Sequence, residues 1–219
     1  ASNEQFIDAY WACLYGGIVP VPVAVGISDE HKQKLLRIAK QLGNPLLYTD
    51  RKLRERLATF AATQGEPEAW TALKPRTFLV DQLDDISREG TPAKVTTDQT
   101  AFIQFSSGST SEPKGVMIPD RVLSANIDAC AEAAELNRDD AMVSWLPLYH
   151  DMGLVGFLAL PMTKGVDLVQ AAPQDFLAHP GNWMQWLSDY RATATAGPNF
   201  SWVLATRALK RMKDLDLSQ

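Results

Sequence analysis

Hydrophobic positions along the chain recur with two different spacings, one typical of helices and one of strands. Over residues 29–43 the apolar side chains lie three or four positions apart, as at Leu35 and Ile38, which predicts a helix. Gly43 follows the last of them, and a glycine at that place is a typical helix stop. The same spacing predicts further helices over residues 1–17, 51–62, 120–136, 151–162, 179–191 and 199–212.

Short apolar runs bounded by polar or turn residues predict strands over residues 45–50, 77–81, 100–105, 141–148, 165–171 and 192–197. Residues 16–25 are rich in β-branched side chains, which are typical of strands, but Pro20 and Pro22 favour a sheet edge or an extended segment. Residues 63–76 are predicted as a loop, and residues 84–98 as a polar connection. Strands that alternate with helices indicate an α/β fold with mostly parallel sheets flanked by helices, in which ligands bind at the carboxyl ends of strands.

The composition is that of a globular protein without a basic surface. The 219 residues are 46% hydrophobic, which is enough to bury a sizeable core. The chain has 21 Lys and Arg against 26 Asp and Glu, and its net charge of -5 argues against a nucleic-acid partner. The basic run at residues 51–56 is interleaved with Leu53 and precedes Leu57, which indicates the solvated face of an ordinary helix.

Cysteine usage and the absence of long apolar runs predict a cytoplasmic location. Cys13 and Cys130 are far apart in the chain, which favours reduced thiols over a disulfide framework or a metal site. No apolar run reaches the roughly 18 residues that a membrane span requires, and the first residues do not resemble a signal peptide. The chain starts inside a helical pattern without Met, so we expect residues 1–219 to be truncated at both ends.

A polar segment, QFSSGSTSEPKGV over residues 104–116, interrupts the apolar pattern. Its glycines and hydroxyl-bearing residues can direct several hydrogen-bond donors toward one point, as phosphate-binding loops do. The spacing differs from the P-loop of nucleoside triphosphatases, because Gly108 is not followed four residues later by Gly-Lys-Ser or Gly-Lys-Thr. A flexible linker or a polar hairpin turn is also compatible with this composition. The apolar runs on both sides, AFIQF at residues 101–105 and VMI at residues 116–118, are predicted as buried strands, and this context favours an anion-binding loop.

Two further polar segments follow predicted strands, and in one domain all three would meet at the same sheet edge. The segment PLYHDMG follows MVSWL, and GPNF follows ATATA. His150 and Asp151 are adjacent in the first of these segments. A lone histidine is most often structural, and Asp151 alone would be an ordinary helix N-cap. A helix N-terminus at the end of a strand also favours an anionic ligand, so the pair is a candidate site.

These motifs carry a resemblance to a known family. SSGSTSEPKGV resembles the phosphate-binding signature of the adenylate-forming (AMP-binding) superfamily, which includes acyl-CoA synthetases, luciferases and peptide-synthetase adenylation domains. SWLPLYHDMGLVG resembles the fatty acyl-AMP ligase branch, and RATATAGPNFSWVLA is similar to the segment that follows there. FIDAYWACLYGGIVPVPV is similar to the family's early helix and strand. The resemblance covers essentially the whole chain and implies that residues 1–219 are part of the large N-terminal domain, with the C-terminal domain absent.

The resemblance implies a reaction in two steps. A fatty acid carboxylate attacks the α-phosphate of ATP with Mg²⁺ bound, pyrophosphate leaves, and the acyl group passes to the phosphopantetheine thiol of an acyl carrier protein. Such chemistry depends on positioned donors and electrostatic stabilisation. His150 is the implied catalytic residue, which would orient the carboxylate or the α-phosphate. The implied residues for the ATP phosphates are Ser106, Ser107, Gly108, Ser109, Thr110, Lys114 and Gly115. The implied residues for the acyl group are Asp151, Met152, Gly153, Leu154, Gly197, Pro198, Asn199 and Phe200.

The chain departs from the family pattern in several respects. Ser111 stands where the signature usually has glycine, which would strain the loop or change its conformation. The Tyr-Gly-x-Thr-Glu segment, whose Glu holds Mg²⁺ in the family, does not occur in the chain, so its metal ligands are unknown. The ribose-binding Asp and the catalytic Lys of the C-terminal domain are also missing. This chain alone is therefore expected to be inactive.

Two alternative functions remain open from the sequence. Acyl-CoA and aryl-CoA synthetases belong to the same superfamily, and the insertion that distinguishes the ligases from them would lie beyond Gln219. The other alternative is a non-catalytic adenylation-like module that binds acyl chains or a protein partner. Ser111 is the one hint toward such a module, whereas Lys114 and His150 argue against it.

Overall fold

The computed structural model describes residues 2–24, 28–43, 45–64, 67–80, 89–106 and 112–219. The chain divides into two compact units. Unit 1 comprises Ala1–Val95 with Thr100–Met117, and unit 2 comprises Thr96–Gln99 with Ile118–Gln219. Each unit contains helices and a pair of parallel strands, so the predicted α/β class is confirmed.

Unit 1 begins with helices whose ends carry recognisable caps. Its elements are α1 (Asn3–Tyr15), α2 (Asp29–Leu42), β1 (Leu47–Thr49), α3 (Arg51–Gln64), α4 (Pro67–Leu73), the 3₁₀-helix η1 (Lys74–Arg76), β2 (Thr77–Leu79), β3 (Thr100–Ser106) and β4 (Lys114–Pro119). The Ser2 hydroxyl accepts the Gln5 amide hydrogen at 3.2 Å, and the Gln5 side chain accepts that of Ser2 at 2.9 Å. Gly43 ends α2 with a φ of 75°, a conformation that favours glycine, as its position in the sequence predicts.

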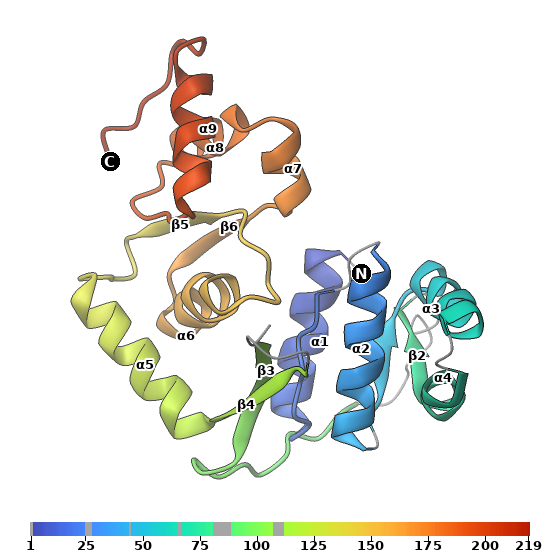
Figure 1. Cartoon of the computed structure of the whole chain (residues 1–219). Coiled ribbons are helices and arrows are strands. Elements are labelled where there is room, and N and C mark those ends of the chain that lie inside the picture. Colours follow the sequence, from blue (N-terminus) through green and yellow to red (C-terminus); the bar gives the residue numbers. More distant parts are fainter. Residues whose placement is uncertain (1, 25–27, 44, 65–66, 81–88, 107–111) are drawn as a thin grey trace. The chain divides into compact units, whose positions relative to one another are not determined.

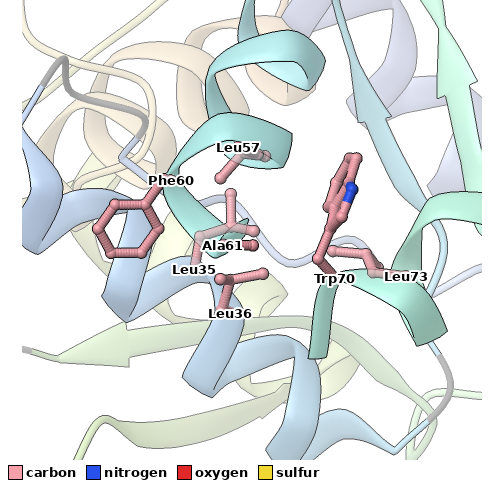
Figure 2. Close-up of a cluster of buried hydrophobic side chains, with 7 residues drawn as sticks. All are labelled: Leu35, Leu36, Leu57, Phe60, Ala61, Trp70 and Leu73. Carbon is pink, nitrogen blue, oxygen red and sulfur yellow. The ribbon is translucent and has the colours of Figure 1, made fainter. Parts of the chain in front are cut away.

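The core of unit 1 lies where α2, α3 and α4 meet. Figure 2 shows its cluster of 7 buried hydrophobic side chains, which are Leu35, Leu36, Leu57, Phe60, Ala61, Trp70 and Leu73. On α3 the buried residues Leu57 and Ala61 are one helical turn apart and define the inner face. The basic residues at 51–56 are exposed or half-buried, which confirms the prediction of a solvated helix face.

The prediction of a loop over residues 63–76 is wrong, because this stretch contains α4 and η1. Pro67 is the first residue of α4, where a missing amide hydrogen costs no intrahelical bond. Trp70 and Leu73 lie three residues apart and bury their side chains in the unit 1 core. The helix has only 7 residues, too few for the apolar spacing to stand out from its polar flanks.

Tyr10 of α1 packs against the ring of Phe102 on β3, with 6.4 Å between ring centroids. Its side chain is buried, and its hydroxyl has no hydrogen-bond partner among the described residues. Burial raises the pKa of this phenol. A buried polar group without a partner costs about 1–3 kcal/mol, so the hydroxyl lowers the stability of the unit that it occupies.

We expect Tyr10→Phe to leave the free energy of unfolding unchanged or to raise it by about 1 kcal/mol, because the variant removes only an unpaired hydroxyl. Urea unfolding of the complete protein that carries residues 1–219 measures this change. Tyr15→Phe is the matched control, since Tyr15 is exposed and its hydroxyl is solvated. A loss of more than about 1 kcal/mol in Tyr10→Phe alone would show that the hydroxyl has a partner.

Unit 2 is built around two parallel strands. Its elements are α5 (Asp120–Ala133), β5 (Ala141–Ser144), the π-helix η3 (Met152–Ala159), α6 (Leu160–Lys164), β6 (Asp167–Gln170), α7 (Pro173–Ala178), α8 (Gly181–Asp189) and α9 (Asn199–Leu209). β5 pairs with β6 so that Ser144 lies opposite Gln170. Helices α7, α8 and α9 gather on one side of this strand pair, and α5 and α6 on the other (Figure 1). Of these helices, α7 has no counterpart among the elements predicted from the sequence.

Residues 151–162 are helical as predicted, but most of the segment is a π-helix. Every residue of η3 is apolar or glycine, and Leu154 and Leu158 are fully buried. A helix that is apolar on all sides belongs in a core, which explains its burial against α5 and β5. π-helical turns are rare and occur frequently at functional sites, so η3 is notable directly after His150.

The strand predicted over residues 192–197 is reduced to a single parallel bridge between Ala194 and Met142. The Val143 amide donates to the Ala194 carbonyl at 3.1 Å. The Thr195 hydroxyl then donates to the Val143 carbonyl at 2.7 Å and so occupies the acceptor that a longer ladder would use. This competition explains why the pairing stops after one bridge.

Cys13 and Cys130 both carry free thiols, and burial raises the pKa of the Cys13 thiol. Within the described ranges, no helix has the length and apolar character needed to cross a bilayer.

Candidate active site

The carboxyl end of β5 is where two of the predicted polar segments come together. β5 lies between β6 and the bridge residue Ala194, and all three run parallel. The segments that follow β5 and Ala194 therefore leave the sheet at the same edge. These segments contain residues 147–154 and 197–200, so the predicted convergence is confirmed for this pair. The third segment, at residues 104–116, belongs to unit 1.

His150 and Asp151 form a close side-chain pair just past β5. His150 Nδ1 lies 2.5 Å from Asp151 Oδ1, and their side chains are 64% and 70% exposed. The same carboxylate oxygen accepts the Met152 amide hydrogen at 2.7 Å. A carboxylate at Nδ1 fixes the imidazole with its proton on that nitrogen when the ring is neutral. This arrangement orients the ring and leaves Nε2 as the nitrogen that can meet a ligand.

The first turn of η3 places the next three predicted residues at different depths. Met152 is 44% exposed, whereas Gly153 and Leu154 are buried. The Leu154 amide donates to the His150 carbonyl at 2.8 Å, which ties the histidine's backbone to the helix. A β-carbon on Gly153 would lie 2.3 Å from the Pro147 carbonyl oxygen, so only glycine allows the chain to pass there. Of these three residues, Met152 is therefore the one that can contact a ligand at the surface.

The segment 197–200 is pressed against aromatic side chains of the same unit. A β-carbon on Gly197 would lie 2.9 Å from the Trp183 ring and 3.5 Å from that of Trp145. Phe200 is 52% exposed, and its ring centroid lies 6.3 Å from that of Trp145. Trp145 directly follows β5, so this ring contact joins the two converging segments. Asn199 and Phe200 are exposed next to it.

A cluster of aromatic rings supports these segments and was not predicted from the sequence. Trp145 stacks on Phe176 of α7 at 3.9 Å between centroids and meets Trp183 of α8 edge-on at 5.8 Å. Trp183 donates its indole hydrogen to the Thr195 hydroxyl at 2.9 Å, and this hydroxyl in turn donates to the Val143 carbonyl. The helical spacing of apolar residues predicts α8, but no local pattern indicates which rings meet across the unit.

In unit 1 the structure describes the two ends of the predicted phosphate loop. Ser107, Gly108, Ser109, Thr110 and Ser111 lie outside the described residues. Ser106 is exposed at the end of β3, Lys114 is exposed at the start of β4, and the two strands form one sheet. A β-carbon on Gly115 would lie 2.9 Å from the Phe105 ring, a close approach that favours glycine. The strands on both sides of the segment are confirmed as β3 and β4, but the expectation that residues 116–118 are buried is wrong, because Val116 is 51% and Met117 is 67% exposed. The phosphate contacts stay a prediction.

Metal ligands are not apparent in the part of the chain that the structure describes. Its residues contain no group of three or more His, Cys, Asp and Glu that could hold a metal ion.

The fold is similar to that of a solved adenylate-forming enzyme. The crystal structure of a fatty acyl-adenylate ligase from L. pneumophila, in complex with acyl adenylate and pyrophosphate, has a TM-score of 0.81 and 26% identity. The similarity covers 100% of this chain and 37% of that one. The profile of the AMP-binding enzyme family matches residues 2–218, and the chain belongs to this family.

Two curated relatives are similar over nearly the whole chain. The 4-hydroxyphenylalkanoate adenylyltransferase of Mycobacterium tuberculosis is 30% identical over 98% of this chain and 34% of its own length. The long-chain-fatty-acid–AMP ligase FadD26 of Mycobacterium marinum is 30% identical over 98% of this chain and 36% of its own length. The chain thus spans about a third of the length of these relatives.

Proposed function

We propose that the complete protein carrying residues 1–219 is a fatty acyl-AMP ligase. It activates a fatty acid carboxylate with ATP, releases pyrophosphate and forms an acyl-adenylate. The phosphopantetheine thiol of an acyl carrier protein then attacks the acyl-adenylate, which forms a thioester and releases AMP. A cytoplasmic location is part of this proposal and rests on the sequence alone.

The observation that carries the proposal is the geometry of His150. The ring stands exposed past the carboxyl end of β5, and Asp151 holds its Nδ1. Nε2 is then placed to hydrogen-bond an oxygen of the substrate carboxylate or of the α-phosphate. A donor at Nε2 requires the doubly protonated ring, in which Nδ1–H donates to Asp151 and Nε2–H donates to the anionic oxygen. In this role His150 orients the attack and forms no covalent bond.

Lys114 and Ser106 support the ATP part of the proposal. Both are exposed at the strand ends that flank the Ser/Gly-rich segment, where a lysine ammonium and a hydroxyl can meet phosphate oxygens. ATP is the nucleotide that membership of the AMP-binding enzyme family implies. Mg²⁺ bound with ATP would neutralise charge on the phosphates.

Met152 and Phe200 support the acyl part of the proposal. Both are large apolar side chains that are about half exposed, and they belong to the two segments that converge at the end of β5. An alkyl chain laid on them would remove apolar surface from water. Each buried methylene contributes about 0.8 kcal/mol, so affinity should rise about fourfold for every carbon until the site is filled.

The test is product analysis with the complete protein. We expect MgATP and a series of fatty acids to give acyl-adenylate and, with coenzyme A and a holo acyl carrier protein offered together, acyl-carrier as the product. Mass spectrometry distinguishes these species, and reactions without ATP are the control. Abundant acyl-CoA would assign the protein to the synthetase branch instead. No ATP-dependent pyrophosphate exchange with any acid would indicate a non-catalytic module.

A further inference from the structure

Trp202 lies in the first turn of α9, two residues after Phe200, and is not one of the predicted acyl-binding residues. Its indole Nε1 donates a hydrogen bond to the Gly197 carbonyl at 3.0 Å. Its ring centroid lies 4.5 Å from that of Trp183. The side chain thus folds back over the turn that leads into α9. Because Trp202 is 43% exposed, replacing it does not open a cavity in the core.

The turn at residues 197–199 is held from the α9 side by a second residue as well. The Ser201 amide and hydroxyl both donate to the Pro198 carbonyl, at 2.9 and 2.6 Å. With the Trp202 bond, the two consecutive carbonyls of Gly197 and Pro198 are both engaged. The backbone that carries Asn199 and Phe200 is therefore fixed by three hydrogen bonds.

The other side of the turn rests on a rigid base. Trp183 is buried, and its own indole hydrogen is bonded to Thr195, whose hydroxyl reaches the Val143 carbonyl of β5. Gly197 approaches this ring so closely that no side chain would fit between them. The turn is held between the ring of Trp183 and the indole N–H of Trp202. Because Trp183 is linked through Thr195 to Val143, the turn has a fixed position relative to β5, the strand that precedes His150.

We propose that Trp202 is a positioning residue for the acyl-binding site, an inference that rests on the proposed function. Its indole N–H holds the turn at residues 197–199 so that Asn199 and Phe200 face the acyl group, and Trp202 itself does not contact the substrate. Loss of this one hydrogen bond loosens the acyl wall and leaves the predicted phosphate-binding residues, which belong to unit 1, unchanged. Replacing Trp202 should therefore change KM for the fatty acid and leave KM for ATP unchanged.

The test is Trp202→Phe in the complete protein, because phenylalanine keeps a ring against Trp183 and removes the N–H. We expect KM for the fatty acid to rise about three- to tenfold, as for the loss of one partly exposed hydrogen bond, with KM for ATP unchanged. Trp186→Phe on α8 is the matched control, since its indole N–H has no acceptor among the described residues and its loss should change neither KM. Ser201→Ala removes the hydroxyl bond to Pro198 and should change KM for the acid in the same direction.

The outcomes separate this inference from the proposed function. If the wild-type protein makes acyl-adenylate but Trp202→Phe and Ser201→Ala leave KM for the acid unchanged, the positioning role is wrong and the function stands. Equal rises in KM for acid and ATP, or the same rise in Trp186→Phe, would also overturn it. If Trp202→Phe does not fold, Ser201→Ala decides the question, because it deletes one hydroxyl and leaves the backbone bond in place. A wild-type protein that adenylates no acid would overturn both proposals.

Discussion

Replacing His150 with alanine is expected to lower the rate of acyl-adenylate formation by at least about tenfold, as for the loss of a positioned donor in the transition state. The fold should not change, because the His150 side chain is exposed. Among the described residues, its ring pairs only with the neighbouring Asp151. The fall should appear in kcat more than in KM for ATP, since the ring acts on the reacting oxygens and not on the adenine or the terminal phosphates.

Single-turnover formation of acyl-adenylate by the complete protein measures this effect, and circular dichroism checks the fold. His179→Ala is the matched control, because His179 is another exposed histidine of unit 2, at the end of α7, and should leave the rate unchanged. Asp151→Asn should give a smaller loss, since asparagine can still accept the Met152 amide hydrogen but replaces the charged partner of His150 Nδ1 with a weaker, neutral one. An unchanged rate in His150→Ala would remove the histidine from the proposed mechanism.

Those parts of the fold with strong local periodicity could be predicted from the sequence. Helices α2 and α3 carry apolar residues at helical spacing over 14 residues each, and Gly43 marks an end that the structure confirms. The helix α4 was missed because its 7 residues hold only two buried side chains, Trp70 and Leu73, whose partners lie on α2 and α3. The π-helical form of η3 could not be predicted, because an all-apolar run has no polar face whose spacing would indicate the number of residues per turn.

The place of the candidate site could be predicted, but its internal support could not. Polar segments after parallel strands share an edge in any such sheet, and this rule placed His150 and Phe200 near the same strand end. The contact between Trp183 and Thr195 joins residues 12 apart, and that between Thr195 and Val143 joins residues 52 apart. Such pairs leave no periodic signal in the sequence, and they require the packed structure to be seen.

Gly153→Ala is expected to have the largest effect on stability of any single methyl group added to unit 2. The new β-carbon would lie 2.3 Å from the Pro147 carbonyl oxygen, 2.9 Å from the Pro147 carbonyl carbon and 3.3 Å from the Leu146 carbonyl carbon. All three are backbone atoms, so no rotation of a side chain can relieve the contact. Either the start of η3 or the backbone at Leu146 and Pro147 must move. His150 lies in the chain between these two places. Overpacking of this kind costs about 1–3 kcal/mol or more.

The complete protein with Gly153→Ala should therefore unfold at lower urea concentration and lose most of its adenylation activity, because the shift displaces the His150 backbone. Gly156→Ala is the matched control: it lies in the same helix, and a β-carbon there would meet no atom within 4 Å. Since alanine is favoured over glycine within a helix, this control should be as stable as the wild type or more stable by about 0.5–1 kcal/mol. If both variants behaved alike, the close passage of Gly153 beneath the Pro147 carbonyl would not be what holds His150 at the end of β5.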